Sequence, residues 1–172
     1  MAHGQRKHKI YDDYFTPKEA WEQVNHFIPK DKTIWECFYG DGKSARHLTE
    51  LGNRVVSINI DFFDDDLMPT HDLCVSNPPF SKTKEVMEKL VERNKPFLMI
   101  MPPGRLGATY MIDLFKEQED QLQIIIPRKR CKFLKADPTT KEPLPEKDQP
   151  KGGFNIYYYC WKMNLPKDIN FI

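Results

Sequence analysis

The stretch DLCVSNPPF, residues 72–80, runs from strand-forming residues directly into an amide, two prolines and an aromatic ring. Prolines donate no backbone hydrogen bond, and each holds the residue before it in an extended conformation. A central strand over residues 73–76 therefore cannot continue past Asn77. The chain must leave the sheet at this point, which predicts a rigid turn at the end of a buried strand.

Length, composition and charge indicate a single globular domain. The chain has 172 residues, 40% of them hydrophobic and 12% aromatic, which suffices for one compact core. Lysine and arginine total 26 against 25 aspartate and glutamate residues, so any nucleic-acid-binding surface must be local. We expect a flexible basic terminus over residues 1–10 and one domain over residues 11–172.

The cysteine pattern and the lack of long apolar segments favour a soluble, intracellular protein of the cytoplasm or nucleus. The four cysteines lie far apart without a CxxC pair, which argues for reduced thiols and against a zinc site. The five histidines are scattered, and we expect no metal site. No stretch has the length of a membrane span, and the first residues lack the apolar segment of a signal peptide.

Hydrophobic periodicity predicts strands that alternate with helices. The expected strands cover residues 33–38, 54–60, 72–76, 96–103, 121–127 and 154–162, and the expected helices cover residues 17–27, 43–52, 82–94 and 110–119. Thr16 and Glu19 have the spacing of a capping box for the first helix. This order predicts an α/β fold with a parallel sheet and an antiparallel hairpin of the last two strands at its edge. Residues 134–153, rich in Pro, Lys and Glu, should form a long exposed loop within that hairpin.

Two unusual turns follow predicted strands, at the sheet edge where open α/β sheets bind ligands. In the first, Glu36 leads into the glycine turn YGDG at residues 39–42. Glycines let a ligand approach the backbone closely, and an acidic side chain suits a cationic or amino-bearing ligand better than a phosphate. A glycine-rich turn that binds no ligand is the alternative.

The second turn is the NPPF stretch at residues 77–80. The Asn77 side-chain oxygen and the Pro78 carbonyl are two acceptors in a rigid frame, and Phe80 adds a flat face beside them. Two acceptors and a ring suit a planar group that carries an amino group, such as adenine, cytosine or a carboxamide. The alternative is a turn that is only stiff.

Three motifs in order, FTP at 15–17, ECFYGDG at 36–42 and SNPPF at 76–80, resemble the S-adenosylmethionine-dependent amino-methyltransferases. The resemblance is to small phage- and virus-type N6-adenine methyltransferases in particular, and most of the match lies in the first hundred residues. It implies a Rossmann-like class I methyltransferase fold and S-adenosyl-L-methionine as the cofactor. It also implies direct methyl transfer to adenine in DNA or RNA, with Asn77, Pro78, Pro79 and Phe80 as the catalytic turn.

The resemblance also assigns the cofactor to a set of residues at the strand ends: Phe15, Thr16, Pro17, Glu36, Phe38, Gly40, Gly42, Asn59 and Asp61. Asn59 stands where the family usually has a carboxylate for the ribose hydroxyls, and an amide lacks the charge-assisted strength of a carboxylate. Too few residues separate Asp61 from Asp72 for the usual helix, strand and helix, which predicts a truncated sheet. Phe62, Asp64 or Asp65 would then cover the cofactor's adenine, and the alternative for Asp65 and Asp66 is a solvated acidic loop.

A basic segment follows the strand predicted at 121–127. Arg128, Lys129 and Arg130 lie close to Phe133, and cations interleaved with a ring suit phosphate contact and base stacking. In the resembling enzymes the corresponding hairpin lies beside the target base. The alternative is a solubilising charge run with Phe133 in the core. The chain has no obvious large target-recognition domain, so we expect loose specificity, a small structured RNA target, or a partner subunit or homodimer.

Two other functions stay open. Methylation of protein glutamine uses a similar Asn-Pro-Pro motif, commonly with Tyr where Phe80 stands, whereas Phe80 and the basic segment favour nucleic acid. A catalytically weak or inactive nucleic-acid-binding subunit is the other, because Asn59 and the short segment before Asp72 depart from the family pattern. The intact SNPPF argues against this second reading, since a module without catalysis has no physical need for that turn.

Overall fold

The computed structural model describes residues 14–137 and 139–172. The terminus expected over residues 1–10 lies outside the described residues. In chain order, the elements are β1 Tyr14–Phe15, α1 Lys18–Glu22, η1 Asn25–Phe27, β2 Thr33–Trp35, α2 Lys43–Glu50, β3 Arg54–Val56, β4 Leu73–Ser76, η2 Phe80–Lys82, α3 Thr83–Arg93, β5 Phe97–Met101, η3 Pro103–Arg105, α4 Thr109–Phe115, β6 Leu122–Ile126, β7 Leu134–Lys135, η4 Glu146–Asp148, β8 Tyr157–Trp161 and β9 Ile169–Phe171. Within the described part of the chain, no helix is long and apolar enough to cross a membrane.

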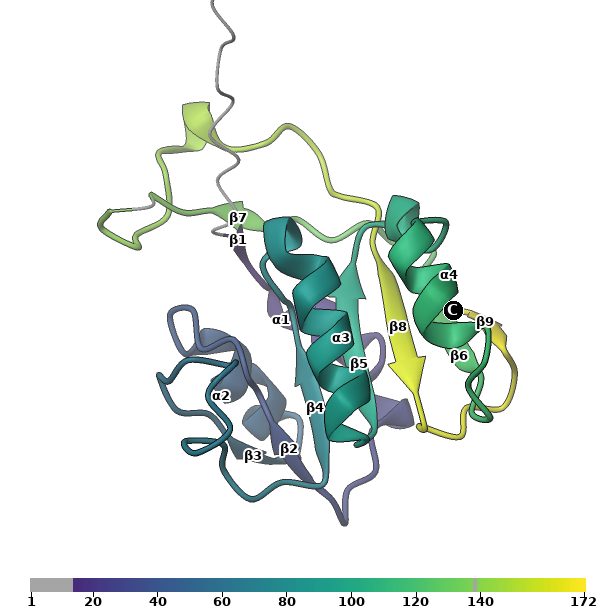
Figure 1. Ribbon diagram of the computed structural model, residues 1–172. Helices are drawn as coiled ribbons and strands as arrows, with labels where there is room; N and C mark the ends of the chain where they lie inside the picture. The colour runs from purple at the N-terminus through teal and green to yellow at the C-terminus, as the bar shows by residue number, and fades with distance from the viewer. Residues whose placement is uncertain (1–13, 138) are drawn as a thin grey trace, which may run out of the picture.

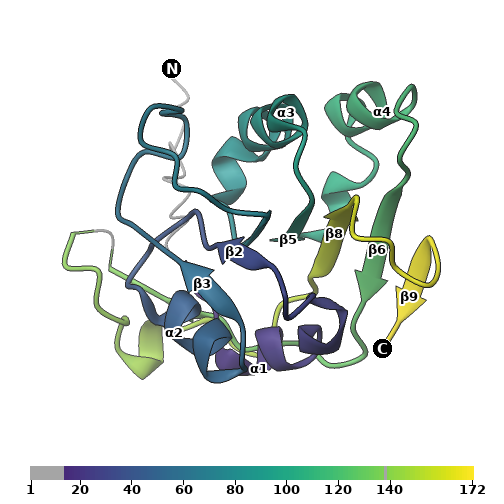
Figure 2. The same ribbon diagram turned by 90° about the horizontal axis from the view of Figure 1, so that it is seen from below.

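The fold has three layers, with helices on both faces of a central sheet (Figures 1 and 2). Among the described residues, seven strands pair in the order β3-β2-β4-β5-β8-β6-β9. Figure 2 shows α3 and α4 on one face of this sheet and α1 and α2 on the other. Because both faces are covered, the central strands read as continuous apolar runs, and every residue of β4 and β5 is buried.

Successive residues of β4 alternate between the two layers. Leu73 and Val75 belong to the core under α1 and α2, whereas Cys74 belongs to the core under α3 and α4. The helices contribute the apolar faces that their spacing predicts. Trp21 of α1 is fully buried in the first core, and Met87 of α3 is fully buried in the second.

The α/β fold with an antiparallel pairing of the last two predicted strands is confirmed, but the hairpin does not lie at the sheet edge. Strand β8 is antiparallel to both β5 and β6 and lies between them. The edge beyond β6 is β9, which pairs with β6 in parallel and which the sequence did not predict. A strand of three residues is too short to give a periodic signal.

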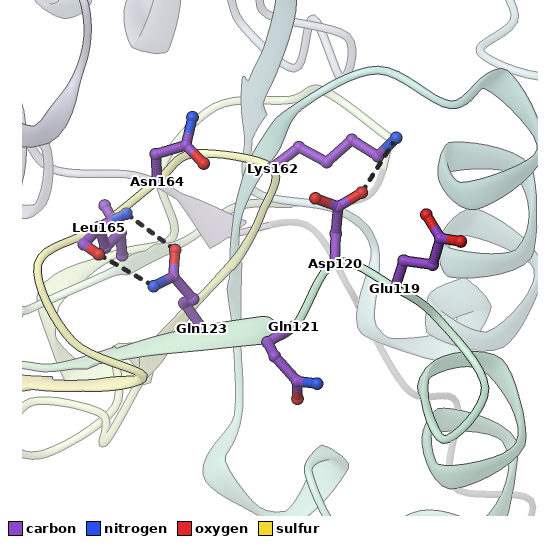
Figure 3. A pocket seen from close by; sticks show the side chains of 7 residues that line it. All are labelled: Glu119, Asp120, Gln121, Gln123, Lys162, Asn164 and Leu165. Atoms are coloured by element: carbon purple, nitrogen blue, oxygen red, sulfur yellow. Dashed lines mark hydrogen bonds and ion pairs between the residues drawn. The ribbon is translucent and has the colours of Figure 1, made fainter.

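Gln123 on β6 fastens the connection that leads from β8 into β9. Its amide oxygen accepts a hydrogen bond from the Leu165 backbone N–H at 2.8 Å, and its amide nitrogen donates to the carbonyls of Leu165 and Lys167, each at 3.0 Å. Figure 3 shows the paired bonds between Gln123 and Leu165. The side chain thus supplies the hydrogen-bonding partners that a short edge strand cannot supply for itself.

The first helix is shorter than predicted, and its capping box is absent. Helix α1 ends at Glu22 and is followed by the separate turn η1. Asn25 interrupts it, because its side-chain amide donates to the Leu51 carbonyl at 3.1 Å and accepts from Asn53 at 2.9 Å. The N-terminus of α1 has no side-chain cap, and Glu19 instead accepts a bond from the Lys132 backbone N–H.

The segment between Asp61 and Asp72 forms neither helix nor strand, so β3 is the other edge of the sheet, as the short segment predicts. Asp65 fixes this segment on α3 through ion pairs with Arg93 at 2.7 Å and Lys89 at 2.6 Å. Asp65 is therefore not simply solvated. The later segment at 134–153 is largely exposed and contributes β7, which pairs with β1 (Figure 1).

Replacing Gln123 with Ala is expected to lower the free energy of unfolding by about 1–3 kcal/mol, because three backbone groups lose their partner. Gln121→Ala is the matched control: that side chain is exposed and points away from Leu165 in Figure 3, so its removal should change the free energy by less than about 0.5 kcal/mol. Urea unfolding of the two variants checks this. Equal effects of both substitutions would contradict the anchoring role.

Candidate active site

The order of the strands reverses between β2 and β4. From β2 the chain moves to β3 on one side and then to β4 on the other, which makes the gap between the carboxyl ends of β2 and β4 the topological switch point. Open α/β sheets bind ligands there. Glu36 directly follows β2, and Asn77 directly follows β4. The two turns singled out in the sequence therefore lie next to each other.

The Glu36 carboxyl group joins the ends of three neighbouring strands. The side chain is only 1% exposed. The Ser76 hydroxyl at the end of β4 donates to one carboxylate oxygen, and the Ser57 hydroxyl just beyond β3 lies 3.1 Å from the other. Neither serine had a role predicted from the sequence, although Ser76 is the first residue of the SNPPF motif.

Burial raises the pKa of Glu36 to about 7, because the charged form loses its hydration. Hydrogen bonds from Ser76 and Ser57, and from the Phe38 backbone, favour the carboxylate and hold this rise in check. Glu36 can therefore take up or release a proton near neutral pH. A cationic group bound beside it would draw it towards the carboxylate.

The Asn77 side chain leaves one acceptor free. Its amide nitrogen donates to the Thr16 hydroxyl at 3.1 Å. Its amide oxygen is buried and has no hydrogen-bond partner among the described residues. A buried acceptor without a partner is unfavourable by about 1–3 kcal/mol, so this oxygen is a prepared site for an incoming N–H donor.

Thr16 reaches Asn77 from a segment 61 positions earlier in the chain. The segment is held by Trp21, whose indole N–H donates to the Ser44 hydroxyl of α2 at 2.9 Å, and by Lys43, whose ammonium group lies 5.2 Å from the centre of the Phe15 ring. The FTP motif, the glycine turn and the NPPF turn therefore meet at one place. Pro17 adjoins them, directly before α1.

Arg105 supports the NPPF turn from β5's side. Its guanidinium group donates to the Phe80 carbonyl at 3.0 Å. The turn η3 that carries Arg105 is itself fixed by the Tyr159 hydroxyl, which bonds the Pro102 and Pro103 carbonyls at 2.8 and 3.2 Å. Arg105 was not predicted from the sequence, although PPGR at residues 102–105 repeats the pattern of prolines at a strand end.

The glycine turn has the backbone that its sequence requires. Gly40 and Gly42 have φ angles of +57° and +76°, the left-handed region that other residues rarely adopt. The Gly42 N–H donates to the Tyr39 carbonyl at 2.8 Å, which closes the turn just before α2. Phe38 is half-buried beside it.

Beyond β3, two of the predicted cofactor residues stay in solvent. Asn59 and Asp61 are both exposed, and the Asp61 carboxylate accepts a bond from the Phe63 backbone N–H at 3.0 Å. Phe62 is 3% exposed and packs on the rings of Phe38 and Trp35, at 4.8 and 5.7 Å between centroids. Phe62 is therefore a core residue and not a cover for a bound ligand.

The basic segment after β6 is divided between surface and core. Arg128, Lys129 and Arg130 are exposed. Phe133 is 5% exposed and packs edge-on against Phe154 at 6.0 Å. The predicted stacking role of Phe133 is therefore wrong, and the alternative of a core residue holds, since a ring buried in this way presents no face to a base.

Comparison with known proteins gives the fold. No protein-family model matches the chain, and no curated protein matches it in sequence. A precorrin-6y C5,15-methyltransferase from Geobacter metallireducens superposes with a TM-score of 0.51 at 11% identity, over 86% of this chain and 91% of that one. A Listeria monocytogenes protein assigned to the class I S-adenosylmethionine-dependent methyltransferases gives 0.55 at 12% identity, over 98% and 67%. The chain thus has the Rossmann-like fold of class I methyltransferases.

The raised pKa of Glu36 predicts a pH-dependent contribution to stability. Because the folded protein holds a proton that the unfolded chain releases from its ordinary pKa of 4.5, the contribution is complete below pH 4.5 and is lost as the pH rises through about 7. Relative to Glu36→Gln, which has no charge to bury, the wild type should lose roughly 2–3 kcal/mol of unfolding free energy between about pH 5 and about pH 8. Urea titrations at several pH values measure this, and parallel pH profiles would refute it.

Proposed function

We propose that the protein is an N6-adenine methyltransferase that acts on nucleic acid with S-adenosyl-L-methionine as its cofactor. The observation that carries this proposal is the buried, unpaired Asn77 side-chain oxygen at the carboxyl end of β4. The Pro78 carbonyl is the next acceptor along the chain, and the half-buried Phe80 ring follows it. Two acceptors beside a ring match an amino group on a planar base.

The residues at the switch point fit S-adenosylmethionine. The cofactor bears an ammonium group and a sulfonium, and Glu36 is an acidic group that a neighbouring cation would ionise. Asn59 is exposed just beyond β3, where an amide can bond ribose hydroxyls. Gly40 and Gly42 would bring the backbone close to the cofactor, and Phe15, Thr16 and Pro17 adjoin its methionine end. The bound cofactor supplies an electrophilic methyl group.

The chain's own residues position the nucleophile. The lone pair of adenine N6 is delocalised into the ring, which makes this amine a poor nucleophile. Hydrogen bonds from its two N–H groups to the Asn77 oxygen and the Pro78 carbonyl favour a pyramidal nitrogen and direct its lone pair towards the methyl group. These bonds strengthen as positive charge develops on N6, so they stabilise the transition state more than the ground state. After transfer N6 loses one proton, which passes to water.

The surface chemistry supports nucleic acid over a protein side chain as the substrate. Arg128, Lys129 and Arg130 form a run of three exposed cations beyond β6. In the sheet, β8 and β5 lie between β6 and β4, and β4 leads into the NPPF turn. Within residues 14–137 and 139–172 no carboxylate pairs with these three cations, and such cations near an amino-group receptor suit a polyanion. A base taken from a duplex would have to be flipped out to reach Asn77.

Substitution of Asn77 by Ala should lower methyl transfer to adenine by at least about 100-fold, because the transition state loses one of its two acceptors. Calorimetry should show that S-adenosylmethionine still binds, since Glu36 and the glycine turn are unchanged. Asn77→Asp is the matched variant, because it keeps an oxygen acceptor and should retain measurable transfer. Wild-type rates in Asn77→Ala, followed with tritiated cofactor on mixed DNA and RNA, would rule out the proposed role.

Thr16 is expected to act as a positioning residue for Asn77. Thr16→Val removes the acceptor for the Asn77 amide nitrogen and should reduce kcat by about 10- to 100-fold, because the amide is then free to rotate. The urea midpoint of unfolding should hardly change, which separates this role from a general loss of folding. Thr16→Ser should restore the rate. If Ser failed to do so, packing of the Thr16 methyl group and not its hydroxyl would be the cause.

A further inference from the structure

A pocket of about 250 Å³ opens between the end of β6 and the start of β8. Its lining combines two cations, two aromatic rings and a carboxamide with proline and isoleucine side chains, and the polar and aromatic residues are Lys129, Arg130, Phe154, Asn155 and Tyr157. Phe154 and Tyr157 are half-buried, whereas Asn155 is exposed. The pocket therefore joins flat apolar faces to positive charge and an adaptable hydrogen-bonding group.

The two cations of this pocket are not used by the fold. Among residues 14–137 and 139–172, neither Lys129 nor Arg130 has a carboxylate partner. The lysines that pair with carboxylates lie elsewhere in the described fold, such as Lys89 on α3. Two adjacent cations without counter-charge raise the local potential and attract an anion.

The backbone under these cations is fixed at both ends. The Arg128 N–H donates to the Ile172 carbonyl at 2.7 Å, and the Phe154 N–H donates to the Cys131 carbonyl at 3.0 Å. Gly153 permits this close approach, because a Cβ there would lie 2.7 Å from the Arg130 Cβ. Lys129 and Arg130 therefore extend from a rigid support, which limits the entropy lost when they bind a ligand.

The pocket shares a structural element with the candidate active site. Pro103 lines the pocket and begins η3, and Arg105 at the other end of η3 holds the Phe80 carbonyl. The strands concerned, β4, β5, β8 and β6, are consecutive in the sheet. At about 4.8 Å between neighbouring strands, the pocket between β8 and β6 lies roughly 10–14 Å from the NPPF turn at the end of β4. A nucleic-acid strand can span that distance with neighbouring nucleotides.

We infer that this pocket binds a nucleotide adjacent to the target adenine. Lys129 and Arg130 contact its phosphate, and its base lies against the rings of Phe154 and Tyr157. This inference rests on the proposed function for the identity of the polymer. It supplies the substrate contacts that Phe133 cannot make, because Phe133 is buried. Base stacking of this kind tolerates any sequence, since every base has a flat face.

Anisotropy of fluorescein-labelled, adenine-containing single-stranded DNA and RNA dodecamers tests the inference across a series of salt concentrations. Lys129→Ala/Arg130→Ala should weaken binding and make the plot of log K against log salt less steep by about 1.4, because two phosphate contacts are lost. Tyr157→Leu should weaken binding by about 5- to 100-fold at an unchanged slope, because it removes a stacking face but no charge.

The matched control is Arg54→Ala/Lys167→Ala, which removes the same charge from two exposed positions at the amino ends of β3 and β9. It should leave both affinity and slope as in the wild type. The inference is overturned if the pocket double variant behaves as this control does. If the pocket double variant shows a reduced slope but Tyr157→Leu binds with wild-type affinity, the base contact is overturned and the pocket is only an anion site.

The two proposals fail in different ways. If the pocket variants keep wild-type binding and slope while the wild type methylates adenine, nucleotide binding in the pocket is refuted and the proposed function stands. If the pocket variants lose binding but the wild type transfers no methyl group to either polymer, nucleotide binding in the pocket stands and the proposed function is refuted.

Discussion

The Glu36 carboxyl group is the interaction on which the site depends. It is buried where three strands end, and the Ser76 and Ser57 hydroxyls bond it from the two neighbouring strands. A buried carboxyl is tolerated only when its hydrogen bonds are satisfied. These bonds therefore set the relative positions of the strand ends, and with them the position of Asn77, which directly follows Ser76. The group that suits a cationic ligand also holds the neighbouring turn in register.

The Asn77 side-chain oxygen stays available as an acceptor because the turn around it is rigid. The two prolines fix the backbone that follows, Thr16 holds the amide nitrogen, and Arg105 holds the Phe80 carbonyl. A mobile amide would turn to find a partner or water and would have to be reorganised for each reaction. Here the acceptor is kept ready, so the cost of leaving it unpaired is met by the stability of the whole fold.

The sequence predicted the parts of the structure that depend on local chemistry. Prolines after a buried run marked the end of β4, and Gly40 and Gly42 marked a turn that only glycine adopts readily. The sequence did not predict contacts between distant segments. The capping pattern of Thr16 and Glu19 is a local signal, but in the structure the Thr16 hydroxyl accepts a hydrogen bond from Asn77 and does not cap the helix. Phe133 next to three cations has the pattern of a surface ring, yet the packing of Phe154 buries it. The placement of β8 inside the sheet depends on which strand edges are free, and no local pattern records this.

The position of β8 also determines when the central sheet can close during translation. Strands β5 and β6 leave the ribosome long before β8, but neither can complete its hydrogen bonds until β8 has entered between them. Until about residue 161 has emerged, the β5 edge is an apolar strand with open backbone groups, the kind of edge that pairs with other chains. The nascent protein therefore needs its last elements before its centre is closed.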